Sequence, residues 1–281
     1  MSYNNDIKPY RIKCFNNNVK EVLFPGDKVE IDNNYITAVQ TREHILYRMV
    51  EDNSKACTHA NKHIIACNID LALIVVSPQT PEIHPKFIDR YLILLNRLQI
   101  PASIIINKCD LIDERTIKIL EIYENMGIRI YKTSAISNTG IEELKKDVMN
   151  KQIILLGQSG VGKTTLTNRL CNQDNRTGKV GDKTKRGRHT TTSSENNFID
   201  ESTMIIDTPG IRSISLKNIT KKDIIEYFNE IESYGRNCKF TNCLHINENK
   251  EYCMVKQAVD KGEILKSRYE SYLKLINEIK K

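Results

Sequence analysis

A glycine-rich loop between an apolar strand and a helix constrains the fold of this chain more than any other feature. The segment IILLGQSGVGKTTLTNRL, residues 153–170, has the pattern Gly157-x4-Gly162-Lys163-Thr164. Glycines allow backbone N–H groups to turn toward a phosphate, and the following helix presents its positive end to the anion. The pattern predicts a P-loop in which Lys163 contacts the β- and γ-phosphates and the Thr164 hydroxyl binds Mg²⁺. The loop residues expected to contact the nucleotide are Gly157, Gln158, Ser159, Gly160, Val161, Gly162, Lys163, Thr164 and Thr165.

A second motif, DTPG at residues 207–210, ends another apolar strand about 44 residues after Lys163. We expect the Asp207 carboxylate to hold Mg²⁺ through water, and Gly210 to let a backbone N–H approach the γ-phosphate. The polar loop between the two motifs contains three consecutive threonines, residues 190–192, and we favour the middle one as the hydroxyl that closes over the metal. The expected catalytic residues are Lys163, Thr164, Thr191, Asp207 and Gly210.

The segment NKCD, residues 107–110, indicates which base the site accepts. An ionised carboxylate only accepts hydrogen bonds, so Asp110 suits the adjacent N1–H and 2-amino donors of guanine, which adenine lacks there. We expect Asn107 to brace the surrounding loops and the stem of Lys108 to lie along the base. The segment TSAISNTG, residues 133–140, follows one βα unit later and supplies backbone contacts to guanine. The residues expected to bind the base of GTP or GDP are Asn107, Lys108, Asp110, Ser134 and Ala135.

The order of these motifs predicts a circular permutation, because NKCD precedes the P-loop instead of following it as in ordinary small GTPases. Apolar runs alternate with helical stretches through this part of the chain, which predicts a parallel sheet with crossover helices. Strands are expected at residues 71–77, 102–108, 128–134, 153–157, near 198 and at 204–207. Helices are expected at residues 85–98, 113–126, 140–149 and 163–171.

The regions on either side of this α/β segment have different sequence patterns. Up to about residue 66, short β-like runs are separated by turn signals, which predicts a small β-barrel or sandwich. These runs are residues 11–15, 20–24, 27–31, 35–40 and 44–50. After residue 213 the strands stop, and helices are expected at 221–233 and 255–281. We therefore predict a multidomain chain with boundaries at 1–66, 67–213 and 214–281.

Three cysteines and one histidine lie within 16 residues near the C-terminus, in the spacing C-x4-C-x-H-x7-C. Three thiolates and an imidazole suit a tetrahedral zinc ion and leave no position for a reactive water, so we interpret the site as structural. The expected zinc ligands are Cys238, Cys243, His245 and Cys253. The other five cysteines are interpreted as small buried thiols. Tyr252 and its basic and amide neighbours suit either an RNA-contacting surface or an ordinary solvated one.

The composition favours a polyanionic partner. The 281 residues include 42 Lys and Arg against 35 Asp and Glu, a formal charge of +7, and residues 174–192 alone hold six basic residues against two Asp. The apolar runs are shorter than the roughly 20 residues that span a bilayer, and residues 1–13 lack the features of a signal peptide. We expect a cytoplasmic monomer without a membrane segment.

NKCD, GQSGVGKT, RHTTT, DTPG and the Cys/His cluster, in this order and spacing, resemble the ribosome small-subunit-dependent GTPase A (RsgA) family of circularly permuted GTPases. The resemblance covers nearly the whole chain, including the junction phrase IIACNIDLALIVVS. It implies an N-terminal OB-fold barrel, a central permuted P-loop GTPase and a C-terminal helical zinc-binding domain. It also implies a role in late 30S maturation, contacts with 16S rRNA, and GTP hydrolysis stimulated by the small subunit.

Two positions depart from the family pattern or from GTPases in general. Asn218 stands where some family members carry a histidine proposed to aid hydrolysis, and Ile211 stands where many GTPases have a glutamine that orients water. We expect slow intrinsic turnover that a partner stimulates, while His189 is more simply an exposed loop residue. One alternative is a GTP-sensing rRNA-binding module with negligible hydrolysis. Another is a permuted GTPase of the large subunit, which would lack the barrel and the zinc cluster.

Overall fold

The structure of the chain is a computed structural model. It describes residues 21–50, 61–171, 195–207 and 219–279. The chain divides into two compact units, one of residues 1–83 and 98–213, the other of residues 84–97 and 214–281. Helix α1 (Pro85–Arg97) therefore groups with the C-terminal helices, although in the sequence it lies between two strands of the central sheet.

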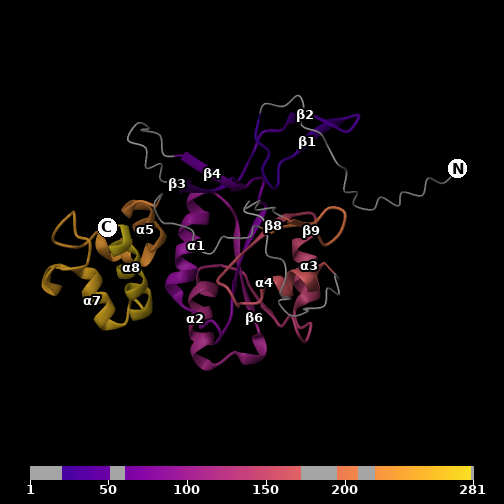
Figure 1. The fold of residues 1–281 in the computed structure, drawn as a ribbon. Coiled ribbons are helices and arrows are strands. Elements are labelled where there is room, and N and C mark those ends of the chain that lie inside the picture. Colours follow the sequence, from indigo (N-terminus) through magenta and orange to yellow (C-terminus); the bar gives the residue numbers. More distant parts are fainter. Residues whose placement is uncertain (1–20, 51–60, 172–194, 208–218, 280–281) are drawn as a thin grey trace, which may run out of the picture. The chain divides into compact units, whose positions relative to one another are not determined.

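A six-stranded sheet organises the first unit (Figure 1). Its strands lie in the order β7-β6-β5-β8-β10-β9, and all neighbours are parallel except β9, which pairs antiparallel with β10. The strands are β5 (Leu71–Val76), β6 (Ala102–Asn107), β7 (Ile130–Thr133), β8 (Gln152–Leu156), β9 (Glu195–Phe198) and β10 (Met204–Asp207). Every residue of β5 is buried, as expected for an unbroken apolar run in a central parallel strand. The predicted parallel sheet is confirmed.

Three helices of this unit follow the predicted alternation: α2 (Glu114–Asn125), α3 (Ile141–Val148) and α4 (Lys163–Leu170). The Asp113 side chain caps α2 by accepting a hydrogen bond from the backbone N–H of Thr116 at 2.8 Å. Leu144 on α3 and Leu166 on α4 belong to one apolar core with alternate residues of the strands. Because alternate strand residues share a face, α3 and α4 cover the same face of the sheet.

Two separate two-stranded antiparallel sheets precede the central sheet. β1 (Val29–Asp32) pairs with β2 (Tyr35–Val39), and β3 (Leu46–Val50) pairs with β4 (Asn61–Ala66). Asn33 and Asn34 both have positive φ, 48° and 65°, as a two-residue hairpin turn requires. A closed OB-fold barrel is not shown, because residues 1–20 and 51–60, with the first expected strand, lie outside the described residues.

The strand expected at residues 20–24 is not formed over the described residues 21–24. The backbone N–H of Phe24 donates to Asp27 Oδ2 at 2.7 Å, and the N–H of Asp27 donates to Phe24 O at 3.1 Å. This turn around Pro25 and Gly26 uses backbone groups that a strand would need for pairing, so local side-chain hydrogen bonding outweighs the β propensity of the sequence.

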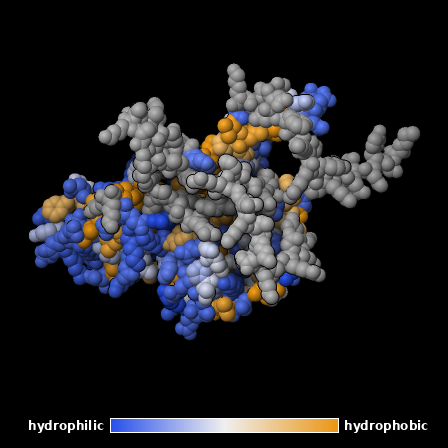
Figure 2. Space-filling view, in the orientation of Figure 1, coloured by the Kyte–Doolittle hydropathy of each residue, from blue (hydrophilic) through white to orange (hydrophobic). Residues whose placement is uncertain are grey.

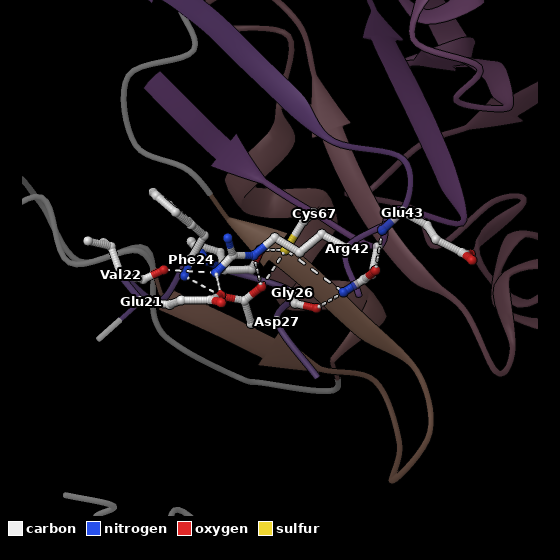
Figure 3. Close-up of polar contacts among 10 residues, drawn as sticks. Glu21, Val22, Phe24, Gly26, Asp27, Arg42, Glu43 and Cys67 are labelled. Atoms are coloured by element: carbon white, nitrogen blue, oxygen red, sulfur yellow. Dashed lines mark hydrogen bonds and ion pairs between the residues drawn. The ribbon is translucent and has the colours of Figure 1, made fainter. Parts of the chain in front are cut away.

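A polar cluster joins this turn to the residues before β5 (Figure 3). Arg42 donates to both oxygens of the Asp27 carboxylate, at 2.6 and 3.0 Å, and Cys67 Sγ donates to the same group at 3.0 Å. Asn68 Nδ2 donates to Gly26 O at 2.9 Å. Gly26 has φ +90°, and a Cβ there would lie 2.0 Å from the carbonyl oxygen of Cys67, so only glycine fits.

The described residues of the second unit form no strand. Its helices are α1, α5 (Lys221–Tyr227), α6 (Asn229–Gly235), the short 3₁₀ helix η3 (Lys250–Tyr252), α7 (Met254–Lys261) and α8 (Lys266–Ile279). The single helices predicted at 221–233 and 255–281 are wrong, since each is interrupted. Phe228, with ψ 68°, separates α5 from α6 while its side chain is fully buried. Gly262, with φ +77°, ends α7 in the left-handed conformation. None of the helices in the described ranges has both the length and the apolar composition of a membrane span.

A buried ion pair ties α1 to the C-terminal helices. Asp89 on α1 is fully buried and accepts hydrogen bonds from Tyr227 Oη at 2.8 Å, from Arg268 Nη1 at 2.7 Å and from the Ser271 hydroxyl. Arg268 also donates to Glu230 at 2.7 Å. Removing either member of such a pair would leave an uncompensated buried charge, which typically costs about 3–5 kcal/mol.

Candidate functional site

The predicted nucleotide motifs gather at one edge of the central sheet, where the parallel strands have their carboxyl ends. The P-loop follows β8, NKCD overlaps the end of β6, TSAISNTG overlaps the end of β7, and Asp207 is the last residue of β10. Strands β5 and β8 are neighbours in the sheet. From β5 the chain continues to β6 and β7 on one side, and the strands that follow β8 lie on the other side. The edge beyond such a switch point is where open α/β sheets usually bind ligands, and the P-loop lies there.

Three glycines give the P-loop its course. Gly157, Gly160 and Gly162 have φ values of 154°, 88° and 96°. A Cβ on Gly157 would lie 2.4 Å from the carbonyl oxygen of Val75, and a Cβ on Gly162 would lie 2.3 Å from Asn107 Nδ2. Side chains at these two positions would therefore collide with β5 and with the NKCD motif, which is why this loop requires glycine there.

Lys163 lies across this loop. Its Nζ donates to the carbonyl oxygens of Gly157 and Gln158, both at 2.7 Å. A phosphate oxygen would be a stronger, charge-assisted acceptor for the same ammonium group. Thr164 and Thr165 follow in the first turn of α4, where backbone N–H groups have no partner within the helix and the helix dipole is positive. The Thr164 side chain is exposed, so its hydroxyl is accessible to a phosphate-bound cation.

Asn107 connects three loops through one buried side chain, which is 2% exposed. Its Nδ2 donates to Val161 O of the P-loop at 2.9 Å. Its Oδ1 accepts from the backbone N–H of Ala135 at 3.2 Å and from Thr133 Oγ1 at 3.4 Å. The NKCD segment, the P-loop and the TSAISNTG segment are thus held together by the amide group of Asn107.

Lys108 makes a second connection between the NKCD segment and the P-loop. It adopts the left-handed conformation, with φ 60°, and its Nζ donates to Thr80 O at 2.7 Å and to Gly160 O at 3.0 Å. Asp110 lies beyond it in the short 3₁₀ helix η1 (Cys109–Leu111) and is exposed. The carboxylate that the sequence predicts to read guanine is therefore accessible to a ligand.

Ser134 and Ala135 are almost completely buried, at 4% and 3% exposed. The backbone of Ser134 donates to Thr139 O at 3.0 Å, and Ala135 O accepts from Arg169 Nε at 3.0 Å. Sequence reasoning gave no role to Thr133, although it is the first residue of TSAISNTG, or to Arg169, which lies five residues beyond the Gly157–Thr164 pattern. Arg169 lies on α4, the helix that follows the P-loop, and this position is the one signal that links it to the site.

Asp207 is paired in β10 with Glu195 of β9, at the same sheet edge as the P-loop. The other residues predicted to surround the γ-phosphate, Thr191 and Gly210, lie outside the described residues, as do His189, Ile211 and Asn218. Their predicted roles stay predictions.

The predicted metal ligands converge in the second unit, between α6 and α7. The ligand atoms of Cys238, Cys243, His245 and Cys253 all lie within 4.8 Å of one another, the one such His/Cys/Asp/Glu cluster in the described residues. His245 Nδ1 lies 3.7, 3.2 and 3.4 Å from the three Sγ atoms, in sequence order. Tetrahedral zinc with bonds of about 2.3 Å to sulfur and about 2.0 Å to nitrogen places such atoms about 3.5 Å apart, so the cluster fits this ion.

The surroundings of this cluster also suit a cation. Burial lowers the pKa of His245 and so favours the neutral imidazole that binds metals. Burial also raises the pKa of the Cys243 thiol to about 12, with the neighbouring Cys253 adding to the effect, and a bound cation would offset this by stabilising the thiolate. The backbone N–H of Met254 points to Cys238 Sγ at 3.3 Å. Zinc bound here would close the loop between α6 and α7.

Comparison with known proteins identifies the family. Residues 39–217 match the family model described as RsgA GTPase. The small ribosomal subunit biogenesis GTPase RsgA of Phocaeicola vulgatus is 35% identical over 263 residues, which are 90% of this chain and 83% of that protein. The protein of the same name from Borreliella burgdorferi (strain ZS7) is 39% identical over 248 residues, 88% of this chain and 78% of that protein.

Solved structures agree with this assignment. The crystal structure of YjeQ from Thermotoga maritima has a TM-score of 0.65 and 31% sequence identity, and covers 92% of this chain and 84% of that one. The structure of YloQ, described as a circularly permuted GTPase, has a TM-score of 0.63 and 27% identity, and covers 93% and 82%. This chain, with its permuted order of motifs, therefore belongs to the RsgA GTPase family and is a GTPase, a hydrolase acting on GTP.

Proposed function

We propose that this GTPase assists the late maturation of the small (30S) ribosomal subunit and that the subunit stimulates its hydrolysis of GTP. The names of its relatives describe them as GTPases of small ribosomal subunit biogenesis. These names carry the ribosomal part of the proposal, and the GTP-binding part is supported by the buried Asn107 side chain, which bonds to the P-loop and to the TSAISNTG segment. This arrangement prepares a site for guanine and phosphate together.

The residues of the site have distinct proposed roles. Lys163 neutralises charge on the β- and γ-phosphates, while Asp110 accepts the two guanine donors. Thr164, Thr191 and Asp207 hold the nucleotide's Mg²⁺, which supplies charge neutralisation of the phosphates when bound. Gly210 allows a backbone N–H to reach the γ-phosphate. A water oxygen attacks the γ-phosphorus as the bond to the β–γ bridging oxygen breaks, which yields GDP and phosphate.

The proposed stimulation follows from the residue after DTPG, where many GTPases have a glutamine that orients the attacking water. Ile211 has no polar group that could orient the attacking water. We therefore propose slow hydrolysis by the isolated protein and completion of the site on the 30S subunit.

The flanking regions are proposed to bind 16S rRNA. We propose an OB-fold within residues 1–66, the permuted GTPase at 67–213, and a helical domain at 214–281 with one structural zinc ion on Cys238, Cys243, His245 and Cys253. The formal charge of +7 supports contacts with phosphates. Because DTPG leads directly into the C-terminal helices, the nucleotide state would reposition residues 212–250. The protein would act as a cytoplasmic monomer.

The test is GTP turnover by the full chain with and without purified 30S subunits. We expect at least tenfold stimulation by 30S subunits, none by 50S subunits, and none in the Lys163→Ala variant. Equal turnover with and without 30S subunits would contradict the proposal. Tight 30S binding without hydrolysis in a single-turnover experiment would instead support a GTP-sensing rRNA-binding module.

A further inference from the structure

Two aromatic side chains are exposed on the loop that carries the metal ligands, residues 236–253. Phe240 is 45% exposed and Tyr252 is 37% exposed. Their ring centroids lie 5.9 Å apart with an interplanar angle of 82°, an edge-to-face pair. In this orientation (Figure 2) the surface is otherwise hydrophilic over much of the C-terminal helical unit, with apolar residues in small separate patches. An exposed aromatic pair in a polar setting offers a surface on which flat groups of a partner can stack.

The backbone around this pair is well ordered by hydrogen bonds. The N–H of Lys239 donates to Tyr252 O at 3.0 Å, which links the chain next to Phe240 directly to Tyr252. The N–H of Cys243 donates to Phe240 O at 3.2 Å, and the N–H of Tyr252 donates to Asn249 O at 3.0 Å. The main chain that carries both aromatic residues is therefore fixed before any ligand arrives, which lowers the entropic cost of binding.

The ammonium group of Lys239 lies next to both aromatic rings. Lys239 Nζ lies 4.0 Å from the centroid of the Tyr252 ring and 5.8 Å from that of Phe240. The other basic side chains of this loop behave differently, since Arg236 pairs with Glu232 and Lys250 pairs with Asp260. Lys239 forms no ion pair with a carboxylate in the described residues. Its charge is therefore available to a phosphate.

The remaining exposed side chains of the loop are mostly small and polar. They include Asn237, Thr241, Asn242, Asn247 and Asn249. Amides and hydroxyls can both donate and accept hydrogen bonds, as the edges of unpaired bases require. A protein partner would instead favour a larger continuous apolar patch around the aromatic anchors.

We infer that Lys239, Phe240 and Tyr252 form a stacking site for unpaired bases of single-stranded RNA, with the lysine neutralising the adjoining phosphate. Aromatic side chains next to a basic group bind single-stranded nucleic acid in this way with little sequence preference. The inference rests on the proposed function only for the source of the RNA, which would be ribosomal RNA of the small subunit.

The test exploits the absence of tryptophan from the whole chain. Phe240→Trp in the full-length, zinc-loaded protein gives a single reporter, whose emission should be quenched by a 12-nucleotide oligouridine while affinity stays within about twofold. Phe240→Ala should weaken binding of the same oligonucleotide, labelled with fluorescein, by about tenfold, from a stacking energy of about 1–3 kcal/mol per base. Lys239→Gln should reduce the slope of log K against log salt by about 0.7.

Matched controls separate this site from general effects. Leu265→Ala removes an apolar side chain that is 54% exposed in the same unit, and Lys250→Gln removes a basic group that is already paired, so neither should change RNA affinity. Zinc content and circular dichroism check that each variant is folded. Unquenched Phe240→Trp emission at saturating RNA would overturn the inference, as would equal RNA affinities of Phe240→Ala and Leu265→Ala.

Two further outcomes distinguish this inference from the proposed function. If Phe240→Ala weakens binding to intact 30S subunits but not to the oligonucleotide, the surface binds protein and the RNA site is refuted. GTP turnover of the wild type with 30S subunits is measured in parallel. Stimulation without any effect of the variants on RNA refutes the stacking site alone, whereas RNA stacking without stimulation supports the site and refutes the proposed 30S activation.

Discussion

Replacement of Asn107 by alanine should break the link between the P-loop and the TSAISNTG segment. It removes none of the groups predicted to bind the nucleotide's phosphates. The side chain joins the P-loop, through Val161 O, to the TSAISNTG segment, through the N–H of Ala135 and the hydroxyl of Thr133. Its exposed fraction is 2%, so water does not replace these bonds without a local rearrangement.

The expected loss follows from these contacts. The bonds of 2.9 and 3.2 Å are of ordinary length, while the one of 3.4 Å to Thr133 is long and contributes less. Each ordinary bond contributes about 1 kcal/mol net, and a buried partner left without a hydrogen bond costs about 1–3 kcal/mol. We expect a total near 3 kcal/mol in the free energy that keeps the loops together, which is about a 100-fold loss of affinity for GDP if binding requires them assembled.

The assay combines the affinity for a fluorescent GDP analogue with native-state hydrogen exchange at the Ala135 amide. Exchange should accelerate in Asn107→Ala because this N–H loses its acceptor. Thr133→Val serves as the matched control, since it removes only the longest of the three bonds and should lower affinity less than threefold. A loss below threefold in Asn107→Ala, with unchanged exchange at Ala135, would refute the idea that this amide holds the site together.

Three other perturbations test separate parts of the molecule. Gly162→Ala should lower nucleotide affinity at least tenfold, because its Cβ would lie 2.3 Å from Asn107 Nδ2, whereas Gly127→Ala, at a similar positive φ with nothing within 4 Å, should not. Cys243→Ser should abolish binding of one zinc ion and lower the thermal stability of the C-terminal helices, measured by metal analysis and circular dichroism. Burial alone raises the pKa of Asp27, but hydrogen bonds from Arg42 and Cys67 hold it below its ordinary value of 3.8. The stability that ionised Asp27 supplies is therefore present above that pH and lost as the pH falls, so the gap in unfolding free energy between wild type and Asp27→Asn should close in acid.

Each of these predictions has a clear contrary result. Equal affinities of the two glycine variants would show that the contact with Asn107 does not matter. Full zinc content in Cys243→Ser would remove this residue from the metal site. Parallel stability curves for wild type and Asp27→Asn across the whole pH range would mean that the Asp27 carboxylate contributes nothing through its charge.

The parts of the fold that the sequence predicted well are those in which function and geometry are encoded by neighbouring residues. The P-loop needs glycine where the chain approaches β5 and Asn107, so its spacing can be read without knowing the contacts themselves. The parallel strands could be predicted equally well. An unbroken apolar run such as Leu71–Val76 is stable mainly as a strand that is buried on both faces of a sheet. The four predicted metal ligands lie within one short loop, so their side chains can meet without any long-range contact, and in the structure their ligand atoms lie within 4.8 Å of one another.

The features that were missed depend on residues far apart in the sequence. Phe228 interrupts a predicted helix because its ring is buried against Tyr272, with centroids 5.6 Å apart, a contact that no local pattern announces. The strand expected up to Phe24 is lost to a turn in which the Asp27 carboxylate accepts from the Phe24 N–H, and Arg42, which follows the β1–β2 hairpin, binds the same carboxylate. Helical and strand propensities are worth only tenths of a kcal/mol per residue, so one tertiary contact of this kind outweighs them.

The place of α1 is the most consequential of these long-range effects. Sequence periodicity assigns it to the crossover between β5 and β6, yet Asp89 on α1 is buried against Arg268 and Ser271 of α8. Any motion of the C-terminal helices must therefore carry α1 with it, unless the cost of separating a buried ion pair is met. The residues that precede α1 in the chain include Thr80, whose carbonyl oxygen accepts a hydrogen bond from Lys108 of NKCD. We therefore propose that movement of the C-terminal helices is transmitted along the chain from α1 to Thr80 and NKCD, in addition to the connection through DTPG that the order of motifs predicts.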